Sequence, residues 1–184
     1  TEILEPCTFV GSVSCSDLGT FVFRSDTAGH SNNTVTVGAG STFAFYPTGY
    51  GTTDTTAWIQ TLRGGGISGK VFVPARQTLT VDYLEGALKI EGAGASLHIN
   101  TLGTNAVLSV TGQMAVTLDS AAPGASLTLA GPATPLSVTG SGVTLDALTL
   151  TSGTVPIRGD FTVNLLGGGG TLLKQGSETL RVLF

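Results

Sequence analysis

The stretch TDTTAWIQTLRGGGISGKVFVPARQTLTV, residues 53–81, decides the fold class. Its first part predicts a short helix, because Asp54 or Thr56 can cap the free backbone N–H groups and three apolar side chains share one helical face. The three apolar residues are Trp58, Ile59 and Leu62. Three glycines, residues 64–66, then end the helix, since glycine reaches left-handed dihedral angles without a steric penalty. The β-branched and aromatic run at 71–73 predicts a strand that stops at Pro74 and resumes at 79–81.

This order of helix, glycines, strand, proline and strand resembles the opening segment of the pectate-lyase-like right-handed β-helix superfamily. The residues that match its pattern are Asp54, Thr55, Ala57, Ile59, Gln60, Gly69, Val71, Val73 and Pro74. The usual Pro-x-Gly is replaced by Pro74-Ala75-Arg76. In that superfamily, and in phage tailspikes of this type, the helix closes the open end of a solenoid. The resemblance implies that Trp58, Ile59 and Leu62 form such a cap; an ordinary surface helix beside a hairpin is the alternative.

Composition limits the classes to which the chain can belong. Hydrophobic residues make up 41% of its 184 residues, which suits one domain with a core, whereas charged residues make up only 11%, about half the usual share. A net charge of −4 argues against a nucleic-acid partner. No apolar run approaches the ~18 residues that a membrane span needs. The chain is therefore expected to be β-rich, and its uncharged polar surface suggests packing against partners or carbohydrate.

The two cysteines, Cys7 and Cys15, have a C-x7-C spacing. Two buried thiols or one local disulfide fit this spacing, and both interpretations stay open. The histidines His30 and His98 are far away in the sequence, so we expect no zinc site. The first residues contain no positively charged segment followed by an apolar run, so the sequence predicts no signal peptide.

Residues 1–50 differ from the rest, since five of the eight phenylalanines precede residue 46. Short aromatic-rich segments alternate here with glycine-containing turns, which is typical of hairpins. We therefore expect a small antiparallel β unit at residues 1–50 that attaches the protein to other proteins, followed by a capped β-helix at residues 51–184.

Alternating apolar pairs repeat through residues 82–166. One ladder is Leu88, Leu108, Leu127 and Leu148, with steps of 20, 19 and 21, and a second is Leu97, Val116, Leu136 and Val155, with steps of 19, 20 and 19. Two ladders with one period indicate repeats that stack on their neighbours. The fold class predicted is all-β, a short single-stranded β-solenoid of about four coils. An antiparallel barrel or sandwich is the alternative.

The C-terminal residues 168–182, GGGTLLKQGSETLRV, resemble the passenger repeat of bacterial autotransporters, which is also β-helical. Glu178 replaces a glycine of that repeat. An apolar strand without a following turn comes last, and its residues are Leu180, Val182, Leu183 and Phe184. Open strand edges pair with other chains, so we expect this edge to hold a partner, in a homotrimer.

Glycan-cleaving enzymes need two carboxyl groups ~5–10 Å apart, so the carboxylates of the repeat region are the candidate catalytic residues. The candidates are Asp82, Glu85, Glu91, Asp119, Asp146 and Asp160. Asp119 and Asp146 follow ladder strands, yet their spacing of 27 does not match the period of about 20. Solvated turn carboxylates explain the set better. We predict no catalytic, cofactor or metal site.

We therefore predict a non-enzymatic structural protein on the surface of a phage-like virion. It would be a tail spike or fibre component, or a capsid decoration protein. Assembly in the host cytoplasm and a host surface polysaccharide as a candidate partner belong to this interpretation. A polysaccharide lyase or hydrolase of the same fold is one alternative. A fragment of a secreted β-helical adhesin is another, because fold alone does not define function.

Overall fold

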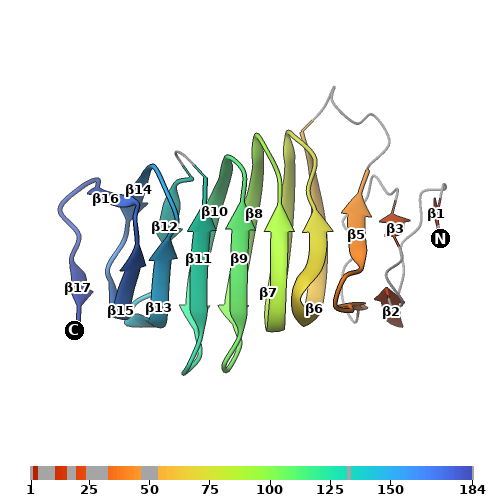
Figure 1. The fold of residues 1–184 in the computed structure, drawn as a ribbon, viewed down its shortest axis with the longest axis horizontal. Helices are drawn as coiled ribbons and strands as arrows, with labels where there is room; N and C mark the ends of the chain where they lie inside the picture. The colour runs from red at the N-terminus through yellow and green to blue at the C-terminus, as the bar shows by residue number, and fades with distance from the viewer. Residues whose placement is uncertain are drawn as a thin grey trace.

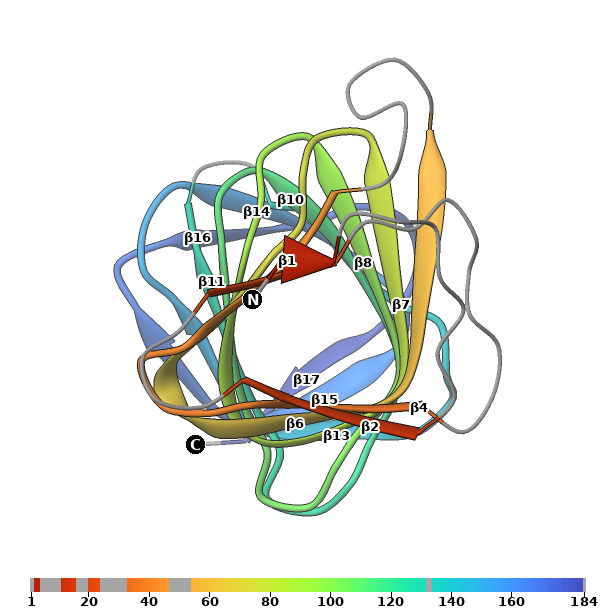
Figure 2. The ribbon, with the colours of Figure 1, turned by 90° about the vertical axis from the view of Figure 1, so that its right-hand side faces the viewer.

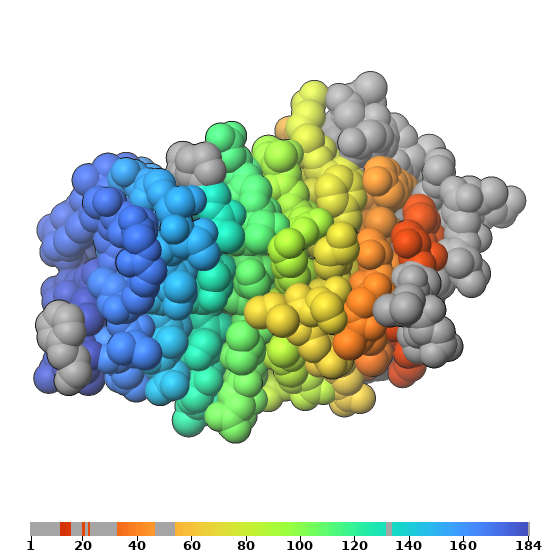
Figure 3. Space-filling model, in the orientation of Figure 1, coloured from red at the N-terminus to blue at the C-terminus, as the bar shows by residue number. Residues whose placement is uncertain are grey.

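The computed structural model of the chain is a parallel β-solenoid of about eight turns (Figure 1). It describes residues 2–3, 11–15, 20–23, 33–46, 54–131 and 134–183. These residues form strands and turns, and no helix occurs among them. Successive segments of the chain lie in successive bands along the long axis (Figure 3). Each turn therefore pairs with the turns before and after it, as in other solenoids.

Most strands are short because the chain bends at each corner of the solenoid. The longest strands are β6 and β7, with 18 and 15 residues, because each runs on through two corners, whereas β8, β10, β13 and β15 each run through one. The strands are β1 (Glu2–Ile3), β2 (Gly11–Cys15), β3 (Thr20–Phe23), β4 (Asn33–Val37), β5 (Thr42–Phe45), β6 (Thr55–Phe72), β7 (Gln77–Glu91), β8 (Ala95–Leu102), β9 (Val107–Thr111), β10 (Met114–Ala121), β11 (Ser126–Ala130), β12 (Leu136–Val138), β13 (Val143–Leu150), β14 (Thr154–Arg158), β15 (Phe161–Gly168), β16 (Thr171–Lys174) and β17 (Leu180–Val182).

The strand pairing gives the solenoid three sides, seen end-on in Figure 2. Side A contains the first parts of β6 and β7, followed by β8, β10, β12, β14 and β16. Side B contains β3, β5, the last parts of β6 and β7, β9, β11 and the last parts of β13 and β15. Side C contains β2, β4, the middle of β6 and β7 and the ends of β8 and β10, and further along the axis the first parts of β13 and β15, and β17.

The interior is filled by the apolar ladders. Leu88, Leu108, Leu127 and Leu148 pair directly in adjacent parallel strands, which confirms the first ladder. In the second ladder Leu97, Val116 and Leu136 pair as predicted. The next partner of Leu136 is Ile157, so the prediction of Val155 was wrong: the ladder continues at the next inward-facing residue, two positions later. The parallel pairing excludes the antiparallel barrel and sandwich. The eight turns exceed the four predicted, because the repeat also includes residues that precede Leu88.

The predicted helix at residues 54–62 is wrong, since this segment is the start of strand β6 and pairs in parallel with β7 from Thr55 to Gly65. Ile59 and Leu62 are both buried, although three residues separate them, because a corner of the solenoid lies between them. The same spacing recurs at Val81/Leu84 and Ile99/Leu102, which are also buried. A corner therefore imitates the i, i+3 spacing of a helical face.

The antiparallel pairing predicted for residues 1–50 is also wrong for the strands described there. β2 pairs with β4 in parallel, β3 pairs with β5 in parallel, and β4 and β5 both pair with β6. The solenoid thus includes these strands, and the aromatic side chains Phe43 and Phe45 lie in its core in edge-to-face contact. The proposed domain boundary near residue 50 lies outside the described residues.

Glycine is required at one corner by close contact between turns. Gly112 has a φ of +89°, and a Cβ there would collide with the carbonyl oxygen of Gly92 in the preceding turn. The C-terminal repeat also forms a parallel turn, because β15 pairs with β17. Its unusual Glu178 is accommodated by folding over Gly176, where a Cβ would collide with the Glu178 carboxylate. Glycine thus provides space for both backbone and side chain.

Candidate functional site

Side A carries two outward-facing columns of polar side chains along the solenoid axis, which we call the polar strip. Alternate side chains of a strand face outward, and in-register pairing aligns them from turn to turn. The first column is Trp58, Thr80, His98, Thr117 and Ser137, which pair in register. The second column is Gln60, Asp82, Asn100, Asp119 and Thr139, each of which directly follows a paired inward residue. The strip is therefore an elongated polar surface with an aromatic residue at one end.

Each carboxylate of the second column accepts a hydrogen bond from the next turn. Asn100 Nδ2 donates to Asp82 Oδ1 at 2.7 Å, and the Thr139 hydroxyl donates to Asp119 Oδ1. Asp160 lies one turn beyond Thr139, and its carboxylate accepts a hydrogen bond from the backbone N–H of Thr179 in the turn after it. These bonds give the carboxylate oxygens hydrogen-bond partners and join neighbouring turns.

His98 supplies a second bond to Asp119. Its Nε2 lies 2.9 Å from Asp119 Oδ2, and each side chain is 39% exposed. Both oxygens of Asp119 therefore have partners, one in the turn before and one in the turn after. Imidazole, carboxylate, amide and hydroxyl groups together form hydrogen bonds readily with a hydroxyl-rich ligand.

Asp82 and Asp119 occupy the same column two turns apart, with Asn100 between them. Two steps between paired strands place their backbones about 10 Å apart. That separation is at the upper end of the range in which two carboxyl groups cleave a glycosidic bond. The backbone spacing of Asp82 and Asp119 therefore suits a carboxylate pair better than the 27-residue spacing of Asp119 and Asp146, which does not match the period.

Asp119 and Asp146 lie in different strands, in keeping with the mismatch between their spacing and the period. Asp146 lies in β13, where its Oδ1 accepts a hydrogen bond from Asn164 at 3.4 Å, in a surface hollow of about 450 Å³. Asp119 lies in β10 with His98 and Thr139 as partners. The spacing of 27 residues exceeds one turn of about 20, so the two residues lie at different positions around the solenoid.

The remaining carboxylates are paired across turns as well. Glu85 forms an ion pair with Arg63, and Glu91 binds both Lys89 and, at 3.8 Å, Lys70. The hydrogen bond from Lys89 holds the pKa of Glu91 below its usual range. Five of the six candidate carboxylates lie in strands, so the expectation of solvated turn carboxylates holds for Asp160 alone.

The predicted edge residues lie at the last turn described. Leu180 and Val182 belong to β17, which pairs with β15, and both side chains are partly buried. Leu183 is 39% exposed, and Phe184 lies outside the described residues. Of the predicted cap, Ile59 and Leu62 are core residues, whereas Trp58 is partly buried in the polar strip.

The sequence interpretation missed the polar strip because it followed the inward-facing apolar pairs. The residue between the members of each pair faces outward, so Thr80, His98 and Thr117 were already marked by the same period. Reading that intermediate position along the repeat yields the first column directly.

Cys15 is a buried free thiol, and Cys7 lies outside the described residues. Where side chains are described, no three His, Cys, Asp or Glu residues come together as a metal site. The same part of the chain contains no helix of the length and apolarity needed to cross a membrane.

Comparison with protein-family models, with curated proteins and with solved structures gives no match for this chain. The parallel solenoid is compatible with a β-helix superfamily. The narrower resemblances, to phage tailspikes and to autotransporter passengers, have no support from these comparisons. The fold assignment therefore rests on the strand pairing.

Proposed function

We propose that this chain is a non-enzymatic structural protein on the surface of a phage-like virion, as a tail spike or fibre component or a capsid decoration protein. The observation that carries the proposal is the pairing of polar side chains between turns. The carboxylates Asp82, Asp119 and Asp160 each bind a group one turn further along, which suits a stiff scaffold. In this proposal assembly takes place in the host cytoplasm, and residues 1–50 contact other virion proteins.

The proposal includes a homotrimer, which two surface features support. Partly exposed residues of β9, β11 and the last part of β13 carry no charge: Val107, Thr111, Ser126, Thr128, Ala130, Ala147 and Thr149. Two leucines near the C-terminal end, Leu165 and Leu173, are 65% and 48% exposed. Exposed apolar residues of this kind mark interaction surfaces, and cyclic symmetry covers them in every subunit.

Sedimentation velocity of the purified chain at micromolar concentration tests the oligomer. We expect a trimer that dissociates when Leu165→Lys and Leu173→Lys are combined, because the two lysines place charge in the interface. Ile67→Lys is the matched control, since Ile67 is 55% exposed but lies at the corner after side C. A well-folded monomer of the unchanged chain would contradict the trimer.

A glycan-cleaving enzyme is the second candidate, favoured by one observation. Asp82 and Asp119 stand two turns apart on an exposed strip that also presents His98. Release of reducing ends from a host polysaccharide, lost in Asp82→Asn and in Asp119→Asn but kept in Asp146→Asn, would establish the enzyme. Full-length polysaccharide after prolonged incubation with the unchanged chain would favour the structural protein.

A further inference from the structure

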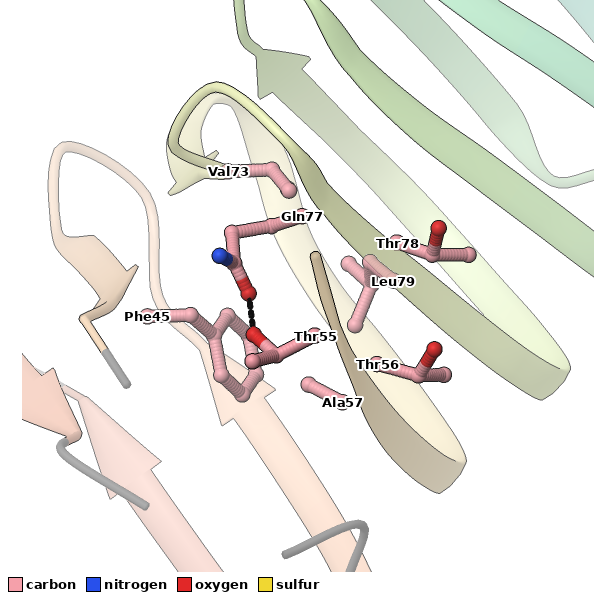
Figure 4. A pocket seen from close by; sticks show the side chains of 8 residues that line it. All are labelled: Phe45, Thr55, Thr56, Ala57, Val73, Gln77, Thr78 and Leu79. Carbon is pink, nitrogen blue, oxygen red and sulfur yellow. Dashed lines mark hydrogen bonds between the residues drawn. The ribbon is translucent and has the colours of Figure 1, made fainter. Parts of the chain in front are cut away.

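A small pocket lies between β5, β6 and β7 (Figure 4). Its lining is mixed, with four apolar and four polar residues: Phe45, Ala57, Val73, Leu79, Thr55, Thr56, Gln77 and Thr78. The space open to the centre of a water molecule is about 10 Å³. This is close to the minimum that one water molecule requires, and it is far too small for an organic ligand.

Gln77 is the polar residue that makes this pocket unusual. Its side chain is only 4% exposed, and Figure 4 shows its amide directed toward Phe45 and Thr55. Oε1 accepts a hydrogen bond from the Thr55 hydroxyl, whereas Nε2 is buried and has no partner within the described chain. A buried amide group without a partner is costly, so native proteins rarely leave one unsatisfied.

We propose that the pocket is a hydration site that holds one water molecule, bound between the Gln77 amide and the Thr55 hydroxyl. The water accepts a hydrogen bond from Nε2 and donates one to the free lone pair of Thr55 Oγ1. The assignment does not depend on the orientation of the amide. If the oxygen and nitrogen of Gln77 are exchanged, the water donates to the oxygen instead.

The position of the water explains why a polar residue begins β7. Gln77 and Thr55 are directly paired at the start of the long β6–β7 contact. Their side-chain bond and the shared water hold the first residues of the two strands in register, where the apolar ladder has not yet begun. This inference is independent of the proposed function, since it concerns any solenoid built from this sequence.

A crystal structure of the full chain at about 1.5 Å resolution tests the site directly. We expect density for one water within hydrogen-bond distance of the Gln77 amide, and none at that place in Gln77→Leu. A dry pocket, or an amide that reaches a protein partner instead, would overturn the proposal.

Thermal unfolding provides a second test, in which Ala57→Val is made both in the unchanged chain and in Gln77→Leu. Ala57 lines the pocket, so the added methyl groups expel the water. In the unchanged background we expect the midpoint to fall by about 2–4 °C, since the amide loses its partner. In the Gln77→Leu background the same change fills an apolar space, so the midpoint should stay constant or rise. Equal shifts of the unfolding midpoint in both backgrounds would contradict the proposed water site.

Discussion

Leu108 lies in the middle of the first apolar ladder, fully buried between Leu88 and Leu127. Leu108→Ala should lower the free energy of unfolding by about 2–5 kcal/mol, because neighbouring turns constrain collapse around the cavity. Ile67→Ala is the control, since Ile67 is 55% exposed and lies outside the proposed trimer interface, and we expect a change within about 0.5 kcal/mol. Urea unfolding measures both. Equal losses would show that Leu108 and Ile67 do not differ in burial.

Cys15 provides a prediction about pH at the same scale. Burial raises the pKa of its thiol to about 11, from an ordinary value of 9.0. A raised pKa in the folded state means that its stabilising contribution is complete below pH 9 and is lost as the pH rises through 11. Urea midpoints should therefore fall more steeply between pH 9 and 11 for the native chain than for Cys15→Ala. Parallel curves would contradict the buried thiol.

Strand β6 shows at the scale of the element what sequence can reveal. The strand at 71–73, the stop at Pro74 and the Leu88 ladder were predictable, because each depends on local chemistry or on a repeated period. The helix at 54–62 was not correctly predicted, since a corner between Ile59 and Leu62 imitates helical spacing. The pair Val81/Leu84, one turn later, has the same spacing and lies within strand β7. Comparison with this pair distinguishes a corner of the solenoid from a helical face.

The polar strip could be predicted in part from the sequence. Its columns follow from the period, but the bonds of Asp119 do not, because they depend on which rotamers reach across turns. The Gln77 pocket was not recoverable. A lone glutamine before an apolar run gives no sign that its amide is buried.

Asn33 secures the corner of β6 and gives a prediction for this element. Its buried side chain donates from Nδ2 to the Trp58 carbonyl at 3.2 Å and accepts from the Gln60 N–H at 2.6 Å. Asn33→Ala should cost about 1–3 kcal/mol for each backbone group left without a partner. It should also speed hydrogen exchange at the Gln60 amide.

Asn100→Ala is the control for this change, because its side-chain amide binds the Asp82 carboxylate and not the backbone. Its exchange rate at Gln60 should match that of the native chain. Unchanged exchange at Gln60 in Asn33→Ala would contradict the role of Asn33 at the corner.

The whole molecule is a stack of turns, and side-chain hydrogen bonds of the described residues join neighbouring turns along it. Arg76 binds Asp54 at 2.9 Å, and Arg158 binds Gln175 at 3.2 Å, and the partners are 22 and 17 positions apart in the sequence. Exposed bonds of this type contribute little individually. Their repetition, together with the apolar ladders, favours a single register, because a slip of one residue would turn every inward side chain outward.

Distances along one column of side B test whether the chain forms a stack of parallel turns in this register. Thr42, Lys70, Lys89, Ser109, Thr128, Thr149 and Gly167 are paired in unbroken succession. Spin labels at Thr42 and at Thr128, Thr149 or Gly167, with both native cysteines replaced by serine and labelled protein diluted in unlabelled protein, can be measured by double electron–electron resonance. Four, five and six strand spacings predict backbone separations of about 19, 24 and 29 Å. A steady increase of about 5 Å per turn is the predicted result; distances that fail to grow along the series would contradict the parallel solenoid.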